Sequence, residues 1–549
     1  MNRLRLYYPA LILLTLAAFA VRSVPLDNQS LWRDEVDALR FATVPWPEML
    51  ATFTRPGWNG PLYFLLLRGW VALTGTSEYA MRFFSLAFGV LCVPLIHVVG
   101  RRLFGRQTGL LASLLAAVSP YMTWYSQEVK MYTLVPALAL LAVYSLRRAI
   151  EGQGWHWWAV QIVATSLAFY SHILAALLIP VQILVYLAWW PRARRQWAGA
   201  LISLACLTLP YLPLLAWQAP LAFQTRQTGF HPYSLGEMVE ILLNGWSLGI
   251  SGWGWPWGAI LMGALATWGA VRPLRGLDQA ALPSIGKSRE SREREAGSTV
   301  TATSVHPTTC EKLSTIGNRL ALVCWIAVPL LAVWIISLRQ PLFTDRYLIW
   351  TAPAFYLLAA LGLTSLGSKN SEGQRSLEAP CSFQHFSNEA ASIPFIMEWR
   401  HWGTGALAGI VLALNGINLW RQAVIPVKSD FRAAAVYVAG RRAPGELILF
   451  QIPYGKHAFD YYFPDDEYSW AEGLYTNHRA PDASYLMNAE EAAHRMQEMT
   501  AEYRAVWLVS TEAAMWDDRG LVQAWLEANW GRVDEAHFVQ VNVYKYVKQ

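Results

Sequence analysis

The chain has few charged residues for its length. Asp, Glu, Lys and Arg make up 15% of the 549 residues, whereas soluble domains average about 25%. This deficit, together with a hydrophobic content of 54%, argues against a cytosolic globular protein. Intrinsic disorder is excluded too, because a chain with this many apolar side chains buries them away from water. The composition therefore indicates a multi-pass membrane protein.

Cysteine is also scarce, and the cysteines are not regularly spaced. The five cysteines show neither the paired spacing of a disulfide framework nor that of a zinc site. They are Cys92, Cys206, Cys310, Cys324 and Cys381.

The formal net charge of +6 is small and comes with no basic helix or nucleic-acid-binding motif. In a membrane protein, Lys and Arg gather in cytoplasmic loops and set the orientation. We therefore expect no nucleic-acid partner.

Long apolar runs fill the first 420 residues. About eleven of them are long enough to cross the hydrocarbon core of a bilayer, some with help from tilt. The first follows a short basic segment and lacks a convincing cleavage site, so we interpret it as a retained signal anchor. The expected spans are 6–23, 80–99, 107–123, 131–148, 156–171, 173–190, 198–217, 256–272, 319–338, 347–366 and 403–420.

The distribution of arginine predicts the orientation. With the N-terminus in the cytoplasm, every even-numbered connection is basic close to a span end, as the positive-inside rule requires. The C-terminus then lies outside, and we expect a multi-pass protein of the inner (plasma) membrane. The cytoplasmic cations are Arg101, Arg102, Arg106, Arg147, Arg148, Arg192, Arg194, Arg195, Arg272 and Arg275.

The composition changes near residue 426. Residues 1–425 are expected to form a mainly α transmembrane domain, whose first outer loop, 24–79, carries juxtamembrane helices. Residues 426–549 alternate helical patterns with strand-like runs, which predicts a small extracytoplasmic α/β domain. The helical patterns are 431–442, 488–500 and 518–530, and the strand-like runs are 447–452, 505–510 and 539–547.

Ionisable groups on the outer face are the informative ones, because charge near lipid is costly without a partner or a purpose. Asp34 and Glu35 follow Trp32 in the first outer loop. Such a pair could supply a general base, a metal ligand or both, and an ordinary solvated acidic pair is the equal alternative. The loop continues through a Gly/Pro turn that includes Asn59, before an amphipathic stretch, 61–74, that begins near Tyr63 and is expected to lie in the interface.

Three further outer segments carry polar groups. In the second loop, Glu128 and Lys130 lie at the mouth of a span, where Lys130 either snorkels to the headgroups or contacts a substrate phosphate. His172 lies in a hairpin turn, where an imidazole binds a metal or a backbone carbonyl. Arg339 and Arg346 lie on the side where orientation signals are not expected, so an anionic headgroup or a carboxylate partner explains them better.

Taken in order, these segments resemble the GT-C superfamily of polyprenyl-phosphate-sugar-dependent glycosyltransferases, in particular its protein mannosyltransferase/ArnT-like branch. The resemblance covers about residues 1–420. The matching segments are Leu31 to Glu35, Pro61 to Phe64, Arg82, Arg101 to Gly105, Ser119-Pro120, Tyr125 to Tyr132, Tyr170 to His172, and Phe343 with Arg346-Tyr347.

The resemblance implies an inverting transfer from an isoprenoid-phosphate sugar to a lipid, glycan or protein acceptor. Asp34 would be the base, Glu35 and Glu128 would assist, and Lys130, Arg339 and Arg346 would bind the lipid phosphate. A divalent metal is not required by the sequence; if one is used, Glu35, Glu128 and His172 are the candidate ligands. The residues expected to line the substrate and acceptor sites are Trp32, Asn59, Tyr63, Tyr125, Tyr132 and Tyr347.

Two positions depart from the family pattern. Asn59-Gly60-Pro61 stands where relatives usually have His-Pro-Pro, which puts any metal or acceptor role of that turn in doubt. Lys130 replaces the usual Arg, which keeps the charge but loses the bidentate geometry.

Other classes of function stay open at this point. A transporter or flippase would be expected to show paired Gly/Pro-broken spans, and none are seen. A non-catalytic protein that binds envelope components would need no carboxylate in the first loop. A transferase with another donor, such as an oligosaccharide ligase, also fits.

Overall fold

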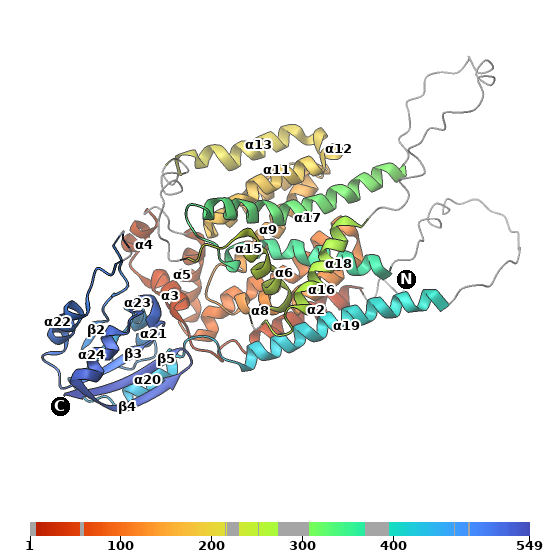
Figure 1. Cartoon of the computed structure of the whole chain (residues 1–549). Helices are drawn as coiled ribbons and strands as arrows, with labels where there is room; N and C mark the ends of the chain where they lie inside the picture. The colour runs from red at the N-terminus through yellow and green to blue at the C-terminus, as the bar shows by residue number, and fades with distance from the viewer. Residues whose placement is uncertain are drawn as a thin grey trace, which may run out of the picture. The chain divides into compact units, whose positions relative to one another are not determined.

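Within the described residues, each of the apolar runs predicted to cross the membrane overlaps helix in the structure, which is a computed structural model of the chain (Figure 1). The run 107–123 is divided between two helices, and 173–190 begins as a 3₁₀ turn. The structure describes residues 7–54, 60–214, 216, 230–250, 252–272, 307–367, 395–465, 467–480, 482 and 484–548.

The chain forms two compact units. Unit 1 contains Met1–Ala18, Gly89–Thr123 and Tyr132–Leu419, and unit 2 contains Phe19–Phe88, Trp124–Met131 and Trp420–Gln549. The first outer loop thus groups with the C-terminal part of the chain. The elements divided between the units are α2 (Tyr7–Ser23), α6 (Glu78–Phe104), α8 (Pro120–Ser126) and α19 (Phe395–Val424).

The described part of unit 1 consists mainly of helices. Its elements are α7 (Arg106–Ala117), α9 (Leu134–Ile150), α10 (His156–Ser171), η1 (Ile173–Leu177), α11 (Leu178–Ala188), α12 (Trp190–Ala193), η2 (Arg194–Gln196), α13 (Trp197–Thr208), η3 (Leu209–Tyr211), α15 (Leu235–Leu248), α16 (Trp257–Val271), α17 (Pro307–Ser337), η4 (Asp345–Thr351) and α18 (Ala352–Gly367).

The described residues include five helices long and apolar enough to cross a membrane, within 78–104, 194–214, 315–337, 345–366 and 403–424. Four shorter apolar helices accompany them, so the membrane character is established, whereas the count of eleven spans stays a prediction. Helix α15 was not predicted. It begins with a capping box between Ser234 and Glu237, and its acidic residues interrupt the hydropathy that would have marked it.

Unit 2 contains three short helices from the first outer loop and one mixed sheet. The loop helices are α3 (Arg33–Thr43), α4 (Trp46–Phe53) and α5 (Leu62–Thr74). The C-terminal elements are α20 (Phe431–Ala439), β1 (Leu447–Phe450), α21 (Gly455–Asp460), β2 (Trp470–Glu472), α22 (Ala489–Thr500), β3 (Ala505–Ser510), α23 (Ala513–Trp516), α24 (Leu521–Asn529), β4 (Trp530–Phe538) and β5 (Val541–Lys548).

The sheet has the order β2-β1-β3-β5-β4, with β1 parallel to β2 and β3, and β5 antiparallel to β3 and β4. Alternate residues of a strand point to opposite faces. Leu447 and Leu449 accordingly pack in a core with Met496 of α22 and Leu526 of α24, while Phe450 contacts Phe459 of α21 at 5.3 Å between ring centroids. The C-terminal part of the chain therefore combines helices with a small sheet, as the alternating patterns predicted, and β2 and β4 are strands that the patterns did not predict.

Helices α16 and α18 approach so closely that glycine is required where they meet. A Cβ on Gly269 would lie 2.1 Å from the carbonyl oxygen of Leu358, and one on Gly362 would lie 2.1 Å from that of Leu265. Small residues allow such backbone approach between membrane helices.

We predict that Gly269→Ala destabilises the protein by about 1–3 kcal/mol, because the added methyl must separate the two helices. Gly263→Ala on the same helix is the matched control, since its Cβ would meet no atom closer than 3.7 Å. Thermal unfolding in detergent, followed by helical ellipticity, measures the difference. Equal melting temperatures for the two variants would contradict the packing described.

Candidate active site at the start of helix α3

Helix α3 places two adjacent carboxylates at its start. Trp32 is the extended N-cap residue, and Asp34 and Glu35 lie in the first turn, where negative charge stabilises the helix dipole. Consecutive residues on a helix point in different directions. The side chain of Asp34 is 16% exposed, whereas that of Glu35 is 0% exposed.

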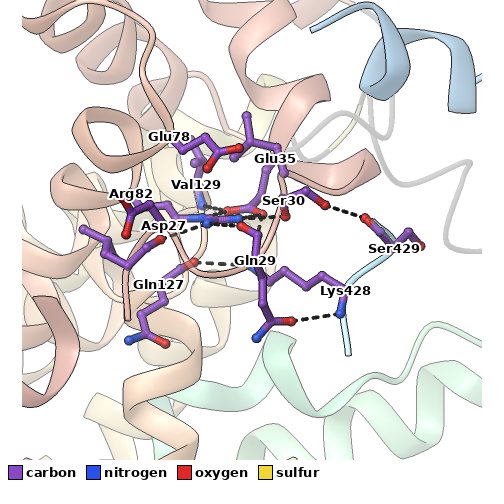
Figure 2. Close-up of polar contacts among 12 residues, drawn as sticks. Asp27, Gln29, Ser30, Glu35, Glu78, Arg82, Gln127, Val129, Lys428 and Ser429 are labelled. Atoms are coloured by element: carbon purple, nitrogen blue, oxygen red, sulfur yellow. Dashed lines mark hydrogen bonds and ion pairs between the residues drawn. The ribbon is translucent and has the colours of Figure 1, made fainter. Parts of the chain in front are cut away.

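Glu35 is held by a set of charged donors in unit 2 (Figure 2). Arg82 of α6 donates from Nε to Oε1 at 2.8 Å and from Nη2 to Oε2 at 2.7 Å. Lys428 donates from Nζ to Oε2 at 3.0 Å. The backbone N–H of Val129 donates to Oε1 at 3.2 Å. Each carboxylate oxygen thus accepts two hydrogen bonds.

The remaining N–H groups of Arg82 are satisfied by backbone carbonyls. They donate to Leu26 at 2.8 Å, to Gln29 at 2.7 Å and to Ser30 at 3.0 Å. The guanidinium therefore fixes the start of the first outer loop at the same time as it pairs with Glu35 (Figure 2).

This arrangement differs from the catalytic or metal-binding role that the sequence predicted for Glu35. Burial alone would raise the pKa of its carboxyl, but the charges of Arg82 and Lys428 and the hydrogen bonds they donate outweigh burial and lower the pKa to about 2. A carboxylate this acidic, with its acceptor positions occupied, is a poor base and a poor ligand. Its geometry is that of a positioning group.

Lys428 is a site residue that the sequence analysis missed. It lies just beyond α19, is buried, and also donates to the backbone carbonyl of Gln127 at 3.3 Å. Burial lowers the pKa of its ammonium, and the charge of Glu35 opposes that shift. An isolated cation on the predicted outer side is the signal that could have identified it.

The segment that carries Glu128 and Lys130 is fixed from both sides. Val129 between them bonds Glu35, as described, and the carbonyl of Lys130 accepts from Ser85 Oγ at 3.0 Å. Ser85 also shares a hydrogen bond of 3.0 Å with the hydroxyl of Tyr63. The structure therefore brings the predicted residues of the first and second outer loops together. Glu128, Tyr63 and Tyr125 are buried in this region, and Trp32 and Lys130 are half-buried.

Arg33 lies beside Asp34 and contacts the C-terminal part of the chain. Its Nε is 3.5 Å from Asp34 Oδ1, and its Nη1 is 3.8 Å from Glu512 Oε2. Its guanidinium lies over the ring of Tyr454, 4.3 Å from the centroid, and the Tyr454 hydroxyl donates to Glu512 Oε2 at 2.5 Å. Tyr454 and Glu512 were not predicted, because no spacing links them to residue 34.

A second group of predicted residues lies in unit 1. The guanidinium of Arg346 is 5.7 Å from the ring centroid of Tyr132, and the rings of His172 and Tyr347 are 5.0 Å apart. Arg339 is exposed at the end of the turn that follows α17. Asn59 lies outside the described residues.

His172 is a neutral group in this cluster. Burial, followed by the charge of Arg346, lowers the pKa of its imidazole to about 4. Nδ1 accepts from the backbone N–H of Leu174 at 3.3 Å, so the neutral ring carries its proton on Nε2. Nε2 is buried, with no hydrogen-bond partner among the described residues, and it is therefore a donor that could meet a substrate oxygen.

The described residues contain no group of three or more His, Cys, Asp or Glu side chains arranged to hold a metal ion. The predicted ligands Glu35, Glu128 and His172 thus do not form such a group.

Unit 1 also contains an apolar cavity of about 810 Å³ between α15, α16, α17 and α18. Its lining is mostly aliphatic and aromatic and includes Leu243, Trp246, Ala259, Leu330 and Phe355.

Part of the chain matches a known protein family. Residues 55–217 match the family model described as dolichyl-phosphate-mannose-protein mannosyltransferase. No curated protein sequence matches the chain.

Solved structures match over almost the whole chain. ArnT from Cupriavidus metallidurans in the apo state is 13% identical, with 97% of each chain covered and a TM-score of 0.53. ArnT bound to undecaprenyl phosphate is 12% identical, with 97% of each chain covered and a TM-score of 0.51. The oligosaccharyltransferase AglB from Archaeoglobus fulgidus, in complex with an inhibitory peptide and a dolichol-phosphate, is 12% identical, with 98% of this chain and 74% of that chain covered and a TM-score of 0.52.

The chain is therefore a membrane protein with the GT-C fold. Residues 55–217 thus resemble protein mannosyltransferases, and the fold is similar to that of ArnT, as the sequence resemblance implied.

We predict that Glu35→Gln lowers the free energy of unfolding by about 3–5 kcal/mol at neutral pH, because it leaves Arg82 and Lys428 buried without a counter-charge. The pKa of Glu35 in the folded state, about 2, lies below its ordinary value of 4.5. Its stabilising effect is therefore complete above about pH 4.5 and is lost as the pH falls toward 2.

Between pH 5 and pH 2, the melting temperature should thus fall less steeply with decreasing pH for Glu35→Gln than for the wild type. Glu48→Gln, which changes an exposed carboxylate on α4, is the matched control and should follow the wild-type curve. A wild-type pH dependence in the Glu35 variant would refute the buried pairing.

Proposed function

We propose that the protein is a membrane glycosyltransferase that moves a sugar from a polyprenyl-phosphate donor to an acceptor hydroxyl. The family match and the GT-C fold support this class. The ArnT and AglB structures contain undecaprenyl phosphate and a dolichol-phosphate, which supports a lipid-linked donor.

The observation that supports this proposal best is the different environment of Asp34 and Glu35. Glu35 fixes the first turn of α3 from the buried side, and Asp34 lies on the partly exposed side next to Arg33. A base must reach the proton it removes, and its position must be held by groups that do not themselves react. Asp34 meets the first requirement, and the Glu35 contacts meet the second.

In the proposed reaction, Asp34 accepts the proton of the acceptor hydroxyl. The hydroxyl oxygen forms a bond to the anomeric carbon from the face opposite the phosphate. The bond between that carbon and the phosphate oxygen breaks, and the lipid phosphate leaves with the electron pair. Attack from the opposite face inverts the anomeric centre.

Positive charge and donors are needed where the phosphate leaves, because its negative charge grows in the transition state. Lys130 in unit 2, and Arg346 with the Nε2–H of His172 in unit 1, are our candidates for this role. Arg339 is a further phosphate contact in the proposal. Glu128 would assist at the acceptor, and Trp32, Tyr63, Tyr125, Tyr132 and Tyr347 would line the substrates.

The apolar cavity between α15 and α18 suits a hydrocarbon chain, since it offers few polar groups. We assign it to the isoprenoid tail of the donor. We also propose that the N-terminus is cytoplasmic and that the catalytic residues and the domain 426–549 lie on the extracytoplasmic face; the arginine-rich connections support this orientation.

Asp34→Asn is expected to lower the rate of sugar transfer by about 10²–10⁴-fold, because an amide cannot accept the proton. Asp37→Asn, on the same helix and 33% exposed, is the matched control and should stay active. Transfer of a labelled sugar by purified protein measures both rates, and the melting temperature confirms folding. Full activity of the Asp34 variant would eliminate this residue as the base.

A panel of polyprenyl-phosphate sugars, assayed with and without chelator, identifies the donor and any need for a divalent metal. We expect sugar transfer with at least one donor of this class. A protein that moves labelled lipid across a bilayer but transfers no sugar would instead be a transporter or flippase, and one that only binds glycan would be a non-catalytic envelope protein.

A further inference from the structure

Unit 1 contains a second cavity, whose lining is mainly polar. It has a volume of about 650 Å³ and forms where the C-terminal ends of α6 and α9 meet the residues around α12. Four arginines and one glutamate provide its charged lining. The lining residues are Val98, Arg101, Arg102, Tyr144, Arg148, Glu151 and Arg192. We call it the arginine pocket.

Glu151 does not neutralise this pocket, because it is shared. It forms ion pairs with Arg102 and with Arg147, the latter at 2.8 Å between Nε and Oε1. Each helix C-terminus adds roughly half a negative charge. Two such ends and one carboxylate are fewer negative charges than the four lining guanidiniums carry, so the pocket stays positive.

Membrane orientation does not explain why these arginines are collected in one place or why one of them is buried. The positive-inside rule requires only cations near span ends, and exposed ones suffice. Arg147 behind the pocket is 4% exposed and is covered by the ring of Trp189, 4.7 Å from its guanidinium. Collecting like charges in a partly buried place costs free energy, and an anion would offset that cost.

The pocket also contains hydrogen-bond donors that the described residues leave unused. Arg102 Nε and Arg148 Nε are buried with no acceptor among the described residues, and so is Arg147 Nη1 behind the pocket. Buried N–H groups are nearly always paired. Their lack of acceptors therefore points to a ligand with several acceptor oxygens.

The side chain of Arg148 is fixed in position by two contacts. Its Nη1 donates to the Tyr144 hydroxyl at 2.9 Å, and its guanidinium lies over the ring of Trp157, 4.6 Å from the centroid. A planar guanidinium fixed in this way loses little freedom when it binds a tetrahedral anion. Arginine forks match phosphate oxygens geometrically.

We propose that the arginine pocket binds a phosphate group. The ligand is either the headgroup of an anionic phospholipid or a soluble phosphate. The pocket lies at the end of α6, one of the helices long and apolar enough to cross a membrane, where basic pockets between helices bind lipid headgroups. The proposal is independent of Asp34 chemistry, because the arginine pocket uses none of the residues assigned to sugar transfer.

The test uses the full-length protein in nanodiscs. Native mass spectrometry measures retention of phosphatidylglycerol against phosphatidylcholine, and calorimetry in phosphatidylcholine nanodiscs measures binding of inorganic phosphate. Preference for phosphatidylglycerol alone identifies a lipid headgroup, and binding of inorganic phosphate identifies a soluble ligand. If neither probe binds, the proposal is overturned.

Variants separate a built pocket from general surface charge. Arg101→Gln is expected to weaken binding about tenfold, as the loss of one charge-assisted contact. Arg195→Gln removes the same charge from an exposed position that does not line the pocket, and should bind as the wild type does. Equal weakening by both variants would overturn the proposal.

Arg148→Lys provides a second test, because it keeps the positive charge and loses the planar guanidinium. It should weaken binding while sugar transfer stays at the wild-type rate. Arg101 is exposed, so Arg101→Gln keeps the test valid if the packed Arg148 variant fails to fold. Wild-type affinity in both variants would also refute the pocket.

Discussion

The ion pairs and hydrogen bonds of the buried Glu35 carboxylate hold together the candidate site in unit 2. They join four stretches of chain: the start of α3, the N-terminal half of α6 through Arg82, the segment 124–131 through Val129, and the chain after α19 through Lys428. A buried ion pair contributes little net stability, but breaking it is costly. Its value here is geometric, because the same carboxylate orients the turn that presents Asp34.

The sequence predicted the fold because its signals were local. Hydropathy located the helices, and alternating patterns located the C-terminal domain, since both depend on neighbours a few residues away. The helix α15 was missed where acidic residues interrupted the apolar run, and β2 was missed because a three-residue edge strand has almost no pattern. The number of membrane crossings is a different matter, since length and composition alone do not decide it for short helices.

The candidate site was only partly predictable, for a physical reason. Asp34 and Glu35 are equivalent as letters, and only their position around a helix decides that one is buried and the other reaches solvent. Arg82 could be matched to a family segment, but Lys428, the other cation that pairs with Glu35, is 393 residues away from Glu35. Tyr454 and Glu512 are equally remote from Arg33. Such contacts come from tertiary packing, which no spacing encodes.

In the proposed reaction, these remote contacts connect the C-terminal part of the chain to the candidate base. Lys428 neutralises Glu35 from one side, and Tyr454 with Glu512 holds Arg33 beside Asp34 from the other. Arg33 thus lies between two carboxylates, 3.5 Å from Asp34 Oδ1 and 3.8 Å from Glu512 Oε2. A change in the loop that carries Glu512 would therefore alter how Arg33 is held beside Asp34. The C-terminal domain is in this sense part of the site, and the first outer loop cannot be understood apart from it.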